Sequence, residues 1–443
     1  MSPNSVISQP EIAVHTLPDG TRQVSVSIMV PAATDIASLL DFEAQAQSAT
    51  NAIGLKVMEL GFAAFDTEGE PILLGKVRMT SKGRSPENYR SLFGSQSIER
   101  HVYQSSQGGK IYVPMEVGGR ILCHCSPRLL SCVSARYTEV PAEKVQMGFA
   151  ESNQITISTS LVQEVARAVG GVALAKEPYW TYLPTNISPS DIAAIGLSID
   201  GALVPLLHEV KWREAMVGTI TLYDDEREVL HTAYFAKAPQ AGKEKFIEQM
   251  AHEVEAYKAW CPDALWVGIS DGAEHLRTLL TPHCQQLVLD FYHVAEYVSG
   301  ASGAMMEVDT PEGRKTWTKH ELHELKHTPG AAEKLRQRLQ TRLDQYEGTK
   351  AASSELVKLL AAAVSYLTNN IDRMDYADCL KEGLPIGSGK VESACKTLVK
   401  LRFCCAGSRW HGESVDALLT VKALRESDGR WAEFWKRIDR RGY

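Results

Sequence analysis

The order of apolar segments in the middle of this chain constrains its fold more than any other feature. Three short apolar segments separated by turns predict consecutive antiparallel strands, and they are residues 195–199, 216–223 and 229–235. An alternation of helical and strand patterns follows, in residues 243–260, 265–269, 275–280 and 286–291. A three-stranded meander followed by alternating helices and strands predicts an α/β domain with a mixed five-stranded sheet.

Carboxylates follow two of these predicted strands. Asp200 closes the first strand and Asp271 the fourth, and each is followed by glycine. The order of elements is that of the ribonuclease-H-like fold, in which the first and fourth strands are neighbours, so we expect Asp200 and Asp271 to meet. Far downstream, Glu392 lies in the first turn of a helix predicted to begin near Ser388. Each acid taken alone also fits a turn or a helix start.

Three such carboxylates suit hard divalent cations. Mg²⁺ takes oxygen ligands and is usually bound by a few carboxylates together with substrate phosphates. Two ions about 3.5–4 Å apart can hold the attacking and leaving oxygens of a phosphoryl displacement. Asp200, Asp271 and Glu392 therefore predict a site for two Mg²⁺ or Mn²⁺ ions in a nucleic-acid enzyme.

The charge of the chain is unevenly distributed. The net charge is −7, yet residues 76–136 carry 10 basic and 3 acidic side chains, and residues 381–443 carry 13 and 8. Residues 1–75, in contrast, have 2 basic and 9 acidic side chains. Basic faces of this kind can neutralise phosphates, although a solvated mixed surface explains either patch equally well.

These patterns divide the chain into five predicted segments. They are an acidic strand and helix (1–75), a basic α+β DNA-binding region (76–190), the first part of the ribonuclease-H-like core (191–293), an α-helical insertion (294–385), and the C-terminal helices of the core (386–443). The basic region is predicted to contain hairpins, helices and a linker. Its helices around 141–169 suit a helix-turn-helix or an ordinary helical corner. The last residues, 439–443, are expected to fray.

Composition places the chain among globular proteins. Its 443 residues exceed what one core normally serves, and 44% are hydrophobic and 23% charged. No apolar run reaches the length of a membrane span, and residues 1–5 lack the pattern of a secretory signal. Nine cysteines are an odd number and do not suggest a disulfide framework. A cytoplasmic protein without a membrane partner is expected.

Several motifs occur in an order that resembles bacterial insertion-sequence transposases of the ISKra type. The resemblance covers roughly residues 95–436 and depends on the joint order of the motifs, since each alone is weak. The motifs are Arg100-His101-Val102-Tyr103-Gln104, Asp271-Gly272-Ala273, Leu289-Asp290-Phe291-Tyr292-His293, Ile386-Gly387-Ser388-Gly389 to Lys396, and Arg430-Trp431-Ala432-Glu433-Phe434-Trp435.

The resemblance implies a DDE transposase with a ribonuclease-H-like core. Asp200 and Asp271 are similar to the two aspartates of that family and Glu392 to its glutamate. Asp290 and His293 match an Asp-x-x-His motif of mutator-like transposases, in which they would support the site. For His293, a histidine in the core with its ring hydrogen-bonded to the backbone is an equal alternative. Asp290 is also the rival of Asp271 as the second metal-binding acid, and Asp271 is preferred because it ends the fourth strand.

The implied reaction has two displacements. Water first cuts a phosphodiester at the element's end and releases a 3′-hydroxyl, and this hydroxyl then attacks target DNA. The expected partner is double-stranded DNA, both the terminal repeats and the target. We expect basic side chains near Glu392 to contact it. One tryptophan could stack on an unpaired base or pack in a helical core. These residues are Lys390, Lys396, Lys400, Arg402, Arg409 and Trp317.

Two other functions stay open. A ribonuclease-H-like nuclease that cuts without joining would carry the same carboxylates, and a non-catalytic DNA-binding regulator derived from a transposase would be expected to lack one of them. The large N-terminal region and the insertion favour the transposase over a minimal nuclease. Because two ends must be brought together, a homodimer or larger oligomer on DNA is expected, in a bacterial cytoplasm and at the nucleoid when bound.

Overall fold

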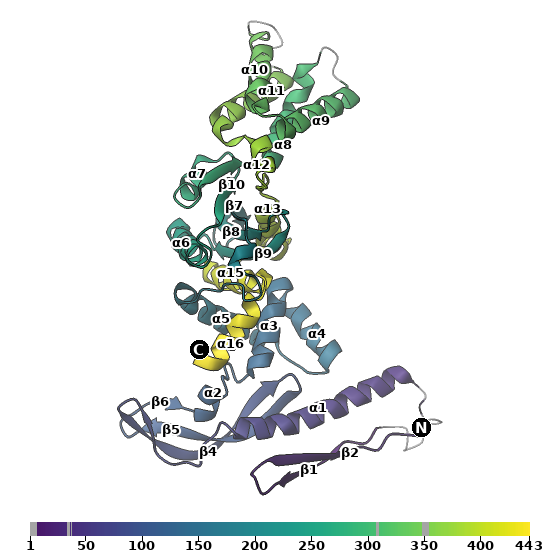
Figure 1. Cartoon of the computed structure of the whole chain (residues 1–443). Helices are drawn as coiled ribbons and strands as arrows, with labels where there is room; N and C mark the ends of the chain where they lie inside the picture. The colour runs from purple at the N-terminus through teal and green to yellow at the C-terminus, as the bar shows by residue number, and fades with distance from the viewer. Residues whose placement is uncertain (1–6, 33–35, 37, 307–309, 348–353) are drawn as a thin grey trace. The chain divides into compact units, whose positions relative to one another are not determined.

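The computed structural model describes residues 7–32, 36, 38–306, 310–347 and 354–443. Contacts within the chain divide it into two compact units, Met1–Ala173 with Ala432–Tyr443, and Leu174–Trp431. All predicted site residues belong to the second unit, which is mixed α/β (Figure 1).

A five-stranded mixed sheet forms the centre of the second unit. Its strands lie in the order β11-β10-β7-β8-β9, and their bounds are Ala194–Val204 (β7), Arg213–Tyr223 (β8), Val229–Lys237 (β9), Leu265–Ser270 (β10) and Gln286–Leu289 (β11). The first three strands form an antiparallel meander, and β10 and β11 extend it in parallel on the far side of β7. The predicted five-stranded mixed sheet is therefore confirmed, as is the pairing of the first and fourth strands.

The two faces of the sheet are covered by different helices. Side chains alternate between faces along a strand, so Ile195, Leu197 and Ile199 share a face and pack with apolar residues of α6 (Gly242–Trp260) and α7 (Glu274–Leu280). Asp200 points to the opposite face, where the thiol of Cys395 donates a hydrogen bond to its Oδ2 at 3.4 Å. The helical segment that carries Glu392 lies on this second face (Figure 1).

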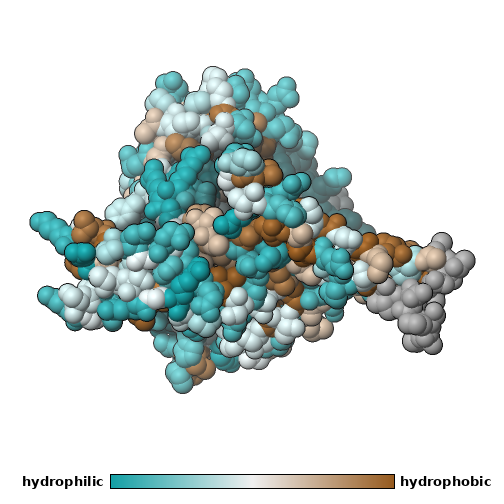
Figure 2. Space-filling view, turned by 90° about the horizontal axis from the view of Figure 1, so that it is seen from below, coloured by the Kyte–Doolittle hydropathy of each residue, from teal (hydrophilic) through white to brown (hydrophobic). Residues whose placement is uncertain are grey.

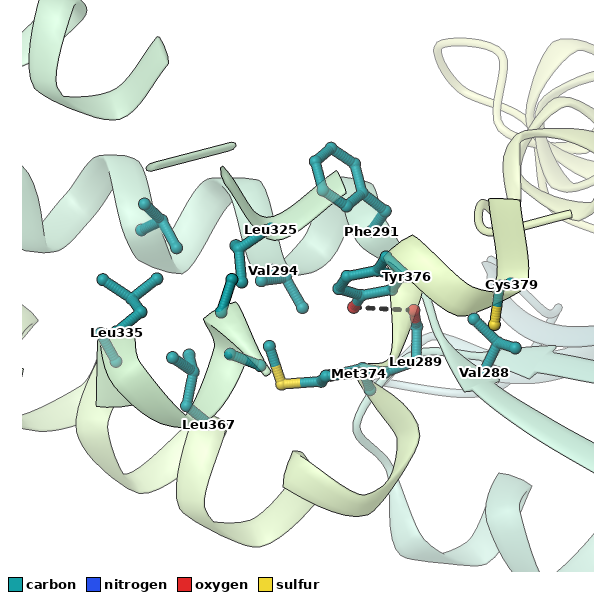
Figure 3. Close-up of a cluster of buried hydrophobic side chains, with 14 of the residues drawn as sticks. Val288, Leu289, Phe291, Val294, Leu325, Leu335, Leu367, Met374, Tyr376 and Cys379 are labelled. Atoms are coloured by element: carbon teal, nitrogen blue, oxygen red, sulfur yellow. Dashed lines mark hydrogen bonds between the residues drawn. The ribbon is translucent and has the colours of Figure 1, made fainter. Parts of the chain in front are cut away.

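Between β11 and Gly389, the described residues form five α-helices. They are Phe291–Ala301 (α8), Pro311–His327 (α9), Ala331–Asp344 (α10), Glu355–Asn370 (α11) and Tyr376–Lys381 (α12). Their apolar residues form one buried cluster with Val288 and Leu289 of β11 (Figure 3). The Tyr376 hydroxyl donates to the Leu289 carbonyl at 3.0 Å. The insertion therefore shares a core with the sheet and holds α8 in a fixed place beside it.

The C-terminal helices complete the second unit and return to the first. They are α13 (Gly389–Ala394), a π-helical turn (Cys395–Lys400), α14 (Leu401–Phe403), α15 (Gly412–Glu426) and α16 (Arg430–Arg441). At the start of α16 the Arg430 guanidinium makes two hydrogen bonds to the carboxylate of Glu253 on α6, at 2.7 and 2.8 Å. Both side chains are buried.

The first unit contains two antiparallel sheets and several helices. β1 (Glu11–Thr16) and β2 (Arg22–Ser27) form a hairpin, and β3 to β6 form a four-stranded sheet, with bounds Ile72–Leu74, Val77–Ser91, Gly94–Ser105 and Gly108–Tyr112. The helices are Leu39–Ala63 (α1), Pro114–Gly118 (α2), Pro127–Glu139 (α3), Ala142–Asn153 (α4) and Thr159–Lys176 (α5), the last reaching the second unit. The predicted hairpins are confirmed.

The N-terminal unit exposes many apolar side chains. On α1, for example, the exposed fraction is 70% for Leu39, 77% for Leu40 and 49% for Val57. On the face seen in Figure 2, hydrophobic residues lie among hydrophilic ones. Among the described residues, no helix is both long and apolar enough to cross a membrane.

Four boundaries differ from the sequence-based expectations. Asp200 does not end its strand, because β7 continues through Gly201 to Val204 in register with β8. β11 stops at Leu289 and Phe291 already begins α8. α5 continues through two glycines to Lys176. The C-terminus is not frayed as far as predicted, since α16 reaches Arg441 and the Tyr443 hydroxyl donates to the Arg120 carbonyl at 2.8 Å.

Candidate metal centre

Three aspartates lie on or directly after neighbouring parallel strands. Ile269 of β10 pairs with Ser198 of β7, so Asp271 and Asp200 stand two residues further along adjacent strands. Ser270 pairs with Leu289 of β11, and the Asp290 backbone nitrogen donates to the Ser270 carbonyl at 2.9 Å. The sheet thus presents three carboxylates at one region, where the sequence predicted two.

Asp290 is the most buried of these acids, with no exposed surface. Its Oδ1 accepts hydrogen bonds from the backbone nitrogens of Tyr292, at 3.2 Å, and Ser388, at 2.9 Å. The first bond caps α8, and the second fixes the loop that precedes α13. Its Oδ2 is buried and, within the described part of the chain, accepts no hydrogen bond. An ionised oxygen in this position needs a proton or a cation.

Glu392 and His293 face this unpaired oxygen. The His293 Nε2 lies 3.8 Å from Asp290 Oδ2, and the Ser388 hydroxyl donates to Glu392 Oε1 at 3.0 Å. One ligand atom from each of Asp290, His293 and Glu392 lies within 4.8 Å of the others, so the three can hold one metal ion. Two carboxylates and an imidazole suit divalent ions that accept oxygen and nitrogen ligands, Mn²⁺ among them.

The electrostatics of Glu392 fit a cation in the same place. Burial raises the pKa of Glu392 above its ordinary value, the hydrogen bond from Ser388 opposes this shift, and the negative charge of Asp290 adds to it. Two carboxylates this close repel each other when both are ionised. A proton shared between the two carboxylates, or a bound cation, would remove this repulsion and satisfy the Asp290 oxygen.

Asp200 and Asp271 form the other part of the acidic cluster. Asp200 Oδ1 accepts from the Gly201 backbone nitrogen at 2.7 Å. Burial raises the pKa of Asp200, hydrogen bonds from Gly201 and Cys395 oppose the shift, and the charge of Asp271 adds to it. Asp271 Oδ1 accepts from the Ala273 backbone nitrogen at 2.9 Å, just before α7. Asp200 and Asp271 each have one oxygen bonded to a backbone nitrogen.

A cavity of about 940 Å³ opens beside these acids. Asp200, His293 and Glu392 line it, and Lys396 and Lys400 stand in the same wall. The two lysines follow Glu392 along the helical segment, as the sequence predicted, and they bring positive charge to a cavity that is also lined by Asp200, Glu296 and Glu392.

The remaining predicted DNA contacts lie in different surroundings. Lys390 lines a neighbouring pocket of about 490 Å³, and Arg409 is exposed. Arg402 is only 4% exposed and lies over the Trp410 ring, with 4.6 Å between its Cζ and the ring centroid. This packing weakens the prediction that Arg402 contacts phosphate. Trp317 is partly buried against the helical core, which is the packing role that competes with base stacking.

Two features of the site were not recognised from the sequence. The first is the hydrogen bond from the Ser388 backbone nitrogen to Asp290, which joins residues 98 positions apart and which no local pattern encodes. Asp290 itself was considered as the rival of Asp271 for the metal. The second feature is Tyr292, 59% exposed and part of the cavity wall. Its position two residues after Asp290 was the one available signal. Compared with known proteins, the chain matches no family model and no curated protein.

Proposed function

We propose that this protein is a DDE transposase with a ribonuclease-H-like core, which cuts the ends of an insertion sequence and joins them to target DNA. The observation that carries the proposal is the gathering of Asp290, His293 and Glu392 around a buried, unpaired carboxylate oxygen, next to Asp200 and Asp271 on adjacent strands. The strand order, with the fourth strand beside the first, supports the proposed fold.

The proposed centre holds two Mg²⁺ or Mn²⁺ ions between these acids. Divalent ions bound there would supply the positive charge that stabilises the attacking and leaving oxygens of a phosphodiester. Asp200, Asp271 and Glu392 remain the proposed ligands, and Asp290 with His293 is proposed to complete the position nearest Glu392. Backbone hydrogen bonds to Asp200, Asp271 and Asp290 hold the carboxylates in place before substrate binds, which reduces the reorganisation needed during the reaction.

The lysines of the cavity are proposed to position the DNA. Lys396 and Lys400 can contact phosphates on either side of the reacting one, because both line the cavity that contains Glu392. Their charges also offset part of the repulsion between the acids and the DNA backbone. The same arrangement serves both displacements, first by water and then by the released 3′-hydroxyl, since each requires only an aligned nucleophile and a stabilised leaving group.

The decisive experiment compares the wild-type protein with Glu392→Gln on a labelled duplex that carries the element's own end. We expect Mn²⁺- or Mg²⁺-dependent cleavage and joining by the wild type, neither in EDTA, and loss of both in the variant with duplex binding nearly unchanged. Glu413→Gln is the matched control, because Glu413 is exposed on α15 and does not line the cavity. Cleavage without joining would identify a nuclease, and binding without either reaction a regulator.

A further inference from the structure

A second groove lies between α8 and α9, outside the acidic cavity. It has a volume of about 870 Å³ and a floor that includes Ala295 and Leu322. Its basic side chains come from α9, and they are Arg314, Lys315, Lys319 and Lys326. Among the residues that the structure describes, no aspartate or glutamate lines it. A groove with cations along one wall and no acid in its described lining is complementary to a polyanion.

The lysines of this groove are available to a ligand. Among the described residues no ion pair joins Lys315, Lys319 or Lys326 to an acid. Lys315 and Lys319 are exposed. The Lys326 Nζ lies 4.5 Å above the centroid of the Phe291 ring. This cation–π contact holds the Lys326 charge beside the first residue of α8.

Tyr292 connects the groove to the acidic cavity. This residue lines the cavity of Glu392, the pocket of Lys390 and the α8–α9 groove. Its ring is 59% exposed and meets the buried Phe291 ring edge-on, at 6.2 Å between centroids and 79° between planes. Lys326 lines both the groove and the Lys390 pocket. A basic path with an exposed aromatic ring at its junction thus leads away from the carboxylates.

We propose that the α8–α9 groove binds a single DNA strand, with one unpaired base stacked on Tyr292 and the following phosphates against Lys326, Lys319 and Lys315. The inference rests on the proposed function, since the strand would be one that continues from the phosphodiester at Glu392. Aromatic rings beside a cationic groove are the general means of binding unpaired nucleotides, because every base offers a face for stacking. A duplex hides its base faces, so the groove should prefer single strands.

The test measures binding of a fluorescein-labelled oligothymidylate to the full-length protein by anisotropy, in EDTA. We expect Tyr292→Ala to weaken binding about tenfold through loss of stacking, and Tyr292→Phe to retain it, because the ring remains. Lys319→Glu should weaken binding and make the dependence of log K on log salt less steep, since fewer counterions are released. Lys358→Glu is the matched control, because Lys358 lies on α11 and does not line the groove.

Three results would overturn the proposal. The first is wild-type affinity for the oligothymidylate in both single variants, Tyr292→Ala and Lys319→Glu. The second is equal affinity of the wild type for a duplex of the same length. The third is displacement of the labelled strand by polyglutamate as effective as displacement by unlabelled oligothymidylate. If the variants bind the strand normally, the groove proposal is wrong, while cleavage at the Glu392 centre can still occur. If the protein binds the strand through the groove but never cleaves DNA, only the proposed function is wrong.

Discussion

The carboxylate of Asp290 has two oxygens in opposite situations. Oδ1 accepts two backbone hydrogen bonds, whereas Oδ2 is buried without a partner in the part of the chain that the structure describes. An unsatisfied buried acceptor costs about 1–3 kcal/mol, and more when it is charged. A cation shared with Glu392 and His293 would remove this cost, so the side chain can serve as a metal ligand as well as a helix cap.

Replacement of this one oxygen tests the arrangement directly. Asp290→Asn keeps the acceptor for Tyr292 and Ser388 but puts an uncharged NH₂ group where the ligand oxygen was. We expect the dissociation constant for Mn²⁺, measured by electron paramagnetic resonance of the free ion, to rise at least about tenfold, because changes even to groups that only support a ligand cost 10–100-fold.

The control and the rival acid are measured in the same way. Asp263→Asn should leave Mn²⁺ binding unchanged, since Asp263 is exposed before β10. Asp271→Asn should also weaken binding, and the larger of the two losses identifies the stronger ligand. Wild-type affinity in Asp290→Asn would show that no ion binds at its Oδ2 and would leave Asp271 as the second acid.

Between elements, the buried pair of Arg430 and Glu253 joins the start of α16 to α6. Arg430 is 3% exposed and also donates to the Tyr257 hydroxyl at 3.3 Å. Arg430→Met leaves the Glu253 charge buried and unpaired, so we expect the free energy of unfolding by urea to fall by about 3–5 kcal/mol. The change should be read from tryptophan fluorescence, because every tryptophan except Trp435 lies in this unit.

A double variant separates the charge from the packing. Arg430→Met with Glu253→Leu replaces the pair by apolar side chains, which is often neutral or stabilising, and should recover most of the loss. Lys245→Met removes the exposed partner of Glu248 and should change the unfolding transition little. If the double variant were as unstable as Arg430→Met, the loss would come from packing and not from the unpaired carboxylate.

The elements also show what the sequence could predict. Residues 195–199 alternate large apolar with small side chains, and this pattern with the order of the following segments was sufficient for the five-stranded sheet. Gly201 was interpreted as the end of a strand, whereas pairing with β8 as far as Arg213 carries β7 past it. Gly170 and Gly171 were interpreted as a helix end for the same reason, and α5 continues through them. Tertiary packing overrides such local breakers.

The candidate site was predictable only in part. Glu392 and Asp271 could be placed because each begins or precedes a helix, and Asp200 because it follows an apolar run. The partnership of Asp290 with Ser388 could not, because it joins residues 98 positions apart through the helical insertion. The packing of Arg402 on Trp410 was equally hidden, since charge alone gives no information about burial.

On the scale of the whole molecule, the two compact units have separate buried clusters, one containing Phe62 and Tyr89 and another containing Phe235 and Trp266. One histidine of the second unit, His231, has a strongly shifted pKa. Burial, and then the neighbouring Arg430 charge, lowers the pKa of His231 from 6.5 to about 4. Its Nε2 lies 3.2 Å from the Tyr257 hydroxyl, so the ring is held neutral next to the Arg430–Glu253 pair.

This histidine should make the second unit sensitive to mild acid. Because its pKa is lower in the folded protein, the unfolded state binds more protons between pH 6.5 and 4, and stability falls as the pH decreases through this window. At pH 5 the loss relative to pH 7 is about 2 kcal/mol from this group. His231→Gln keeps a hydrogen-bonding side chain that does not titrate, so the difference between the urea unfolding free energies at pH 7 and pH 5 should shrink by about that amount. His15→Gln, in the exposed hairpin of the first unit, serves as the control and should leave the difference unchanged. An equal acid loss in wild type and His231→Gln would place the acid sensitivity on the carboxylates instead.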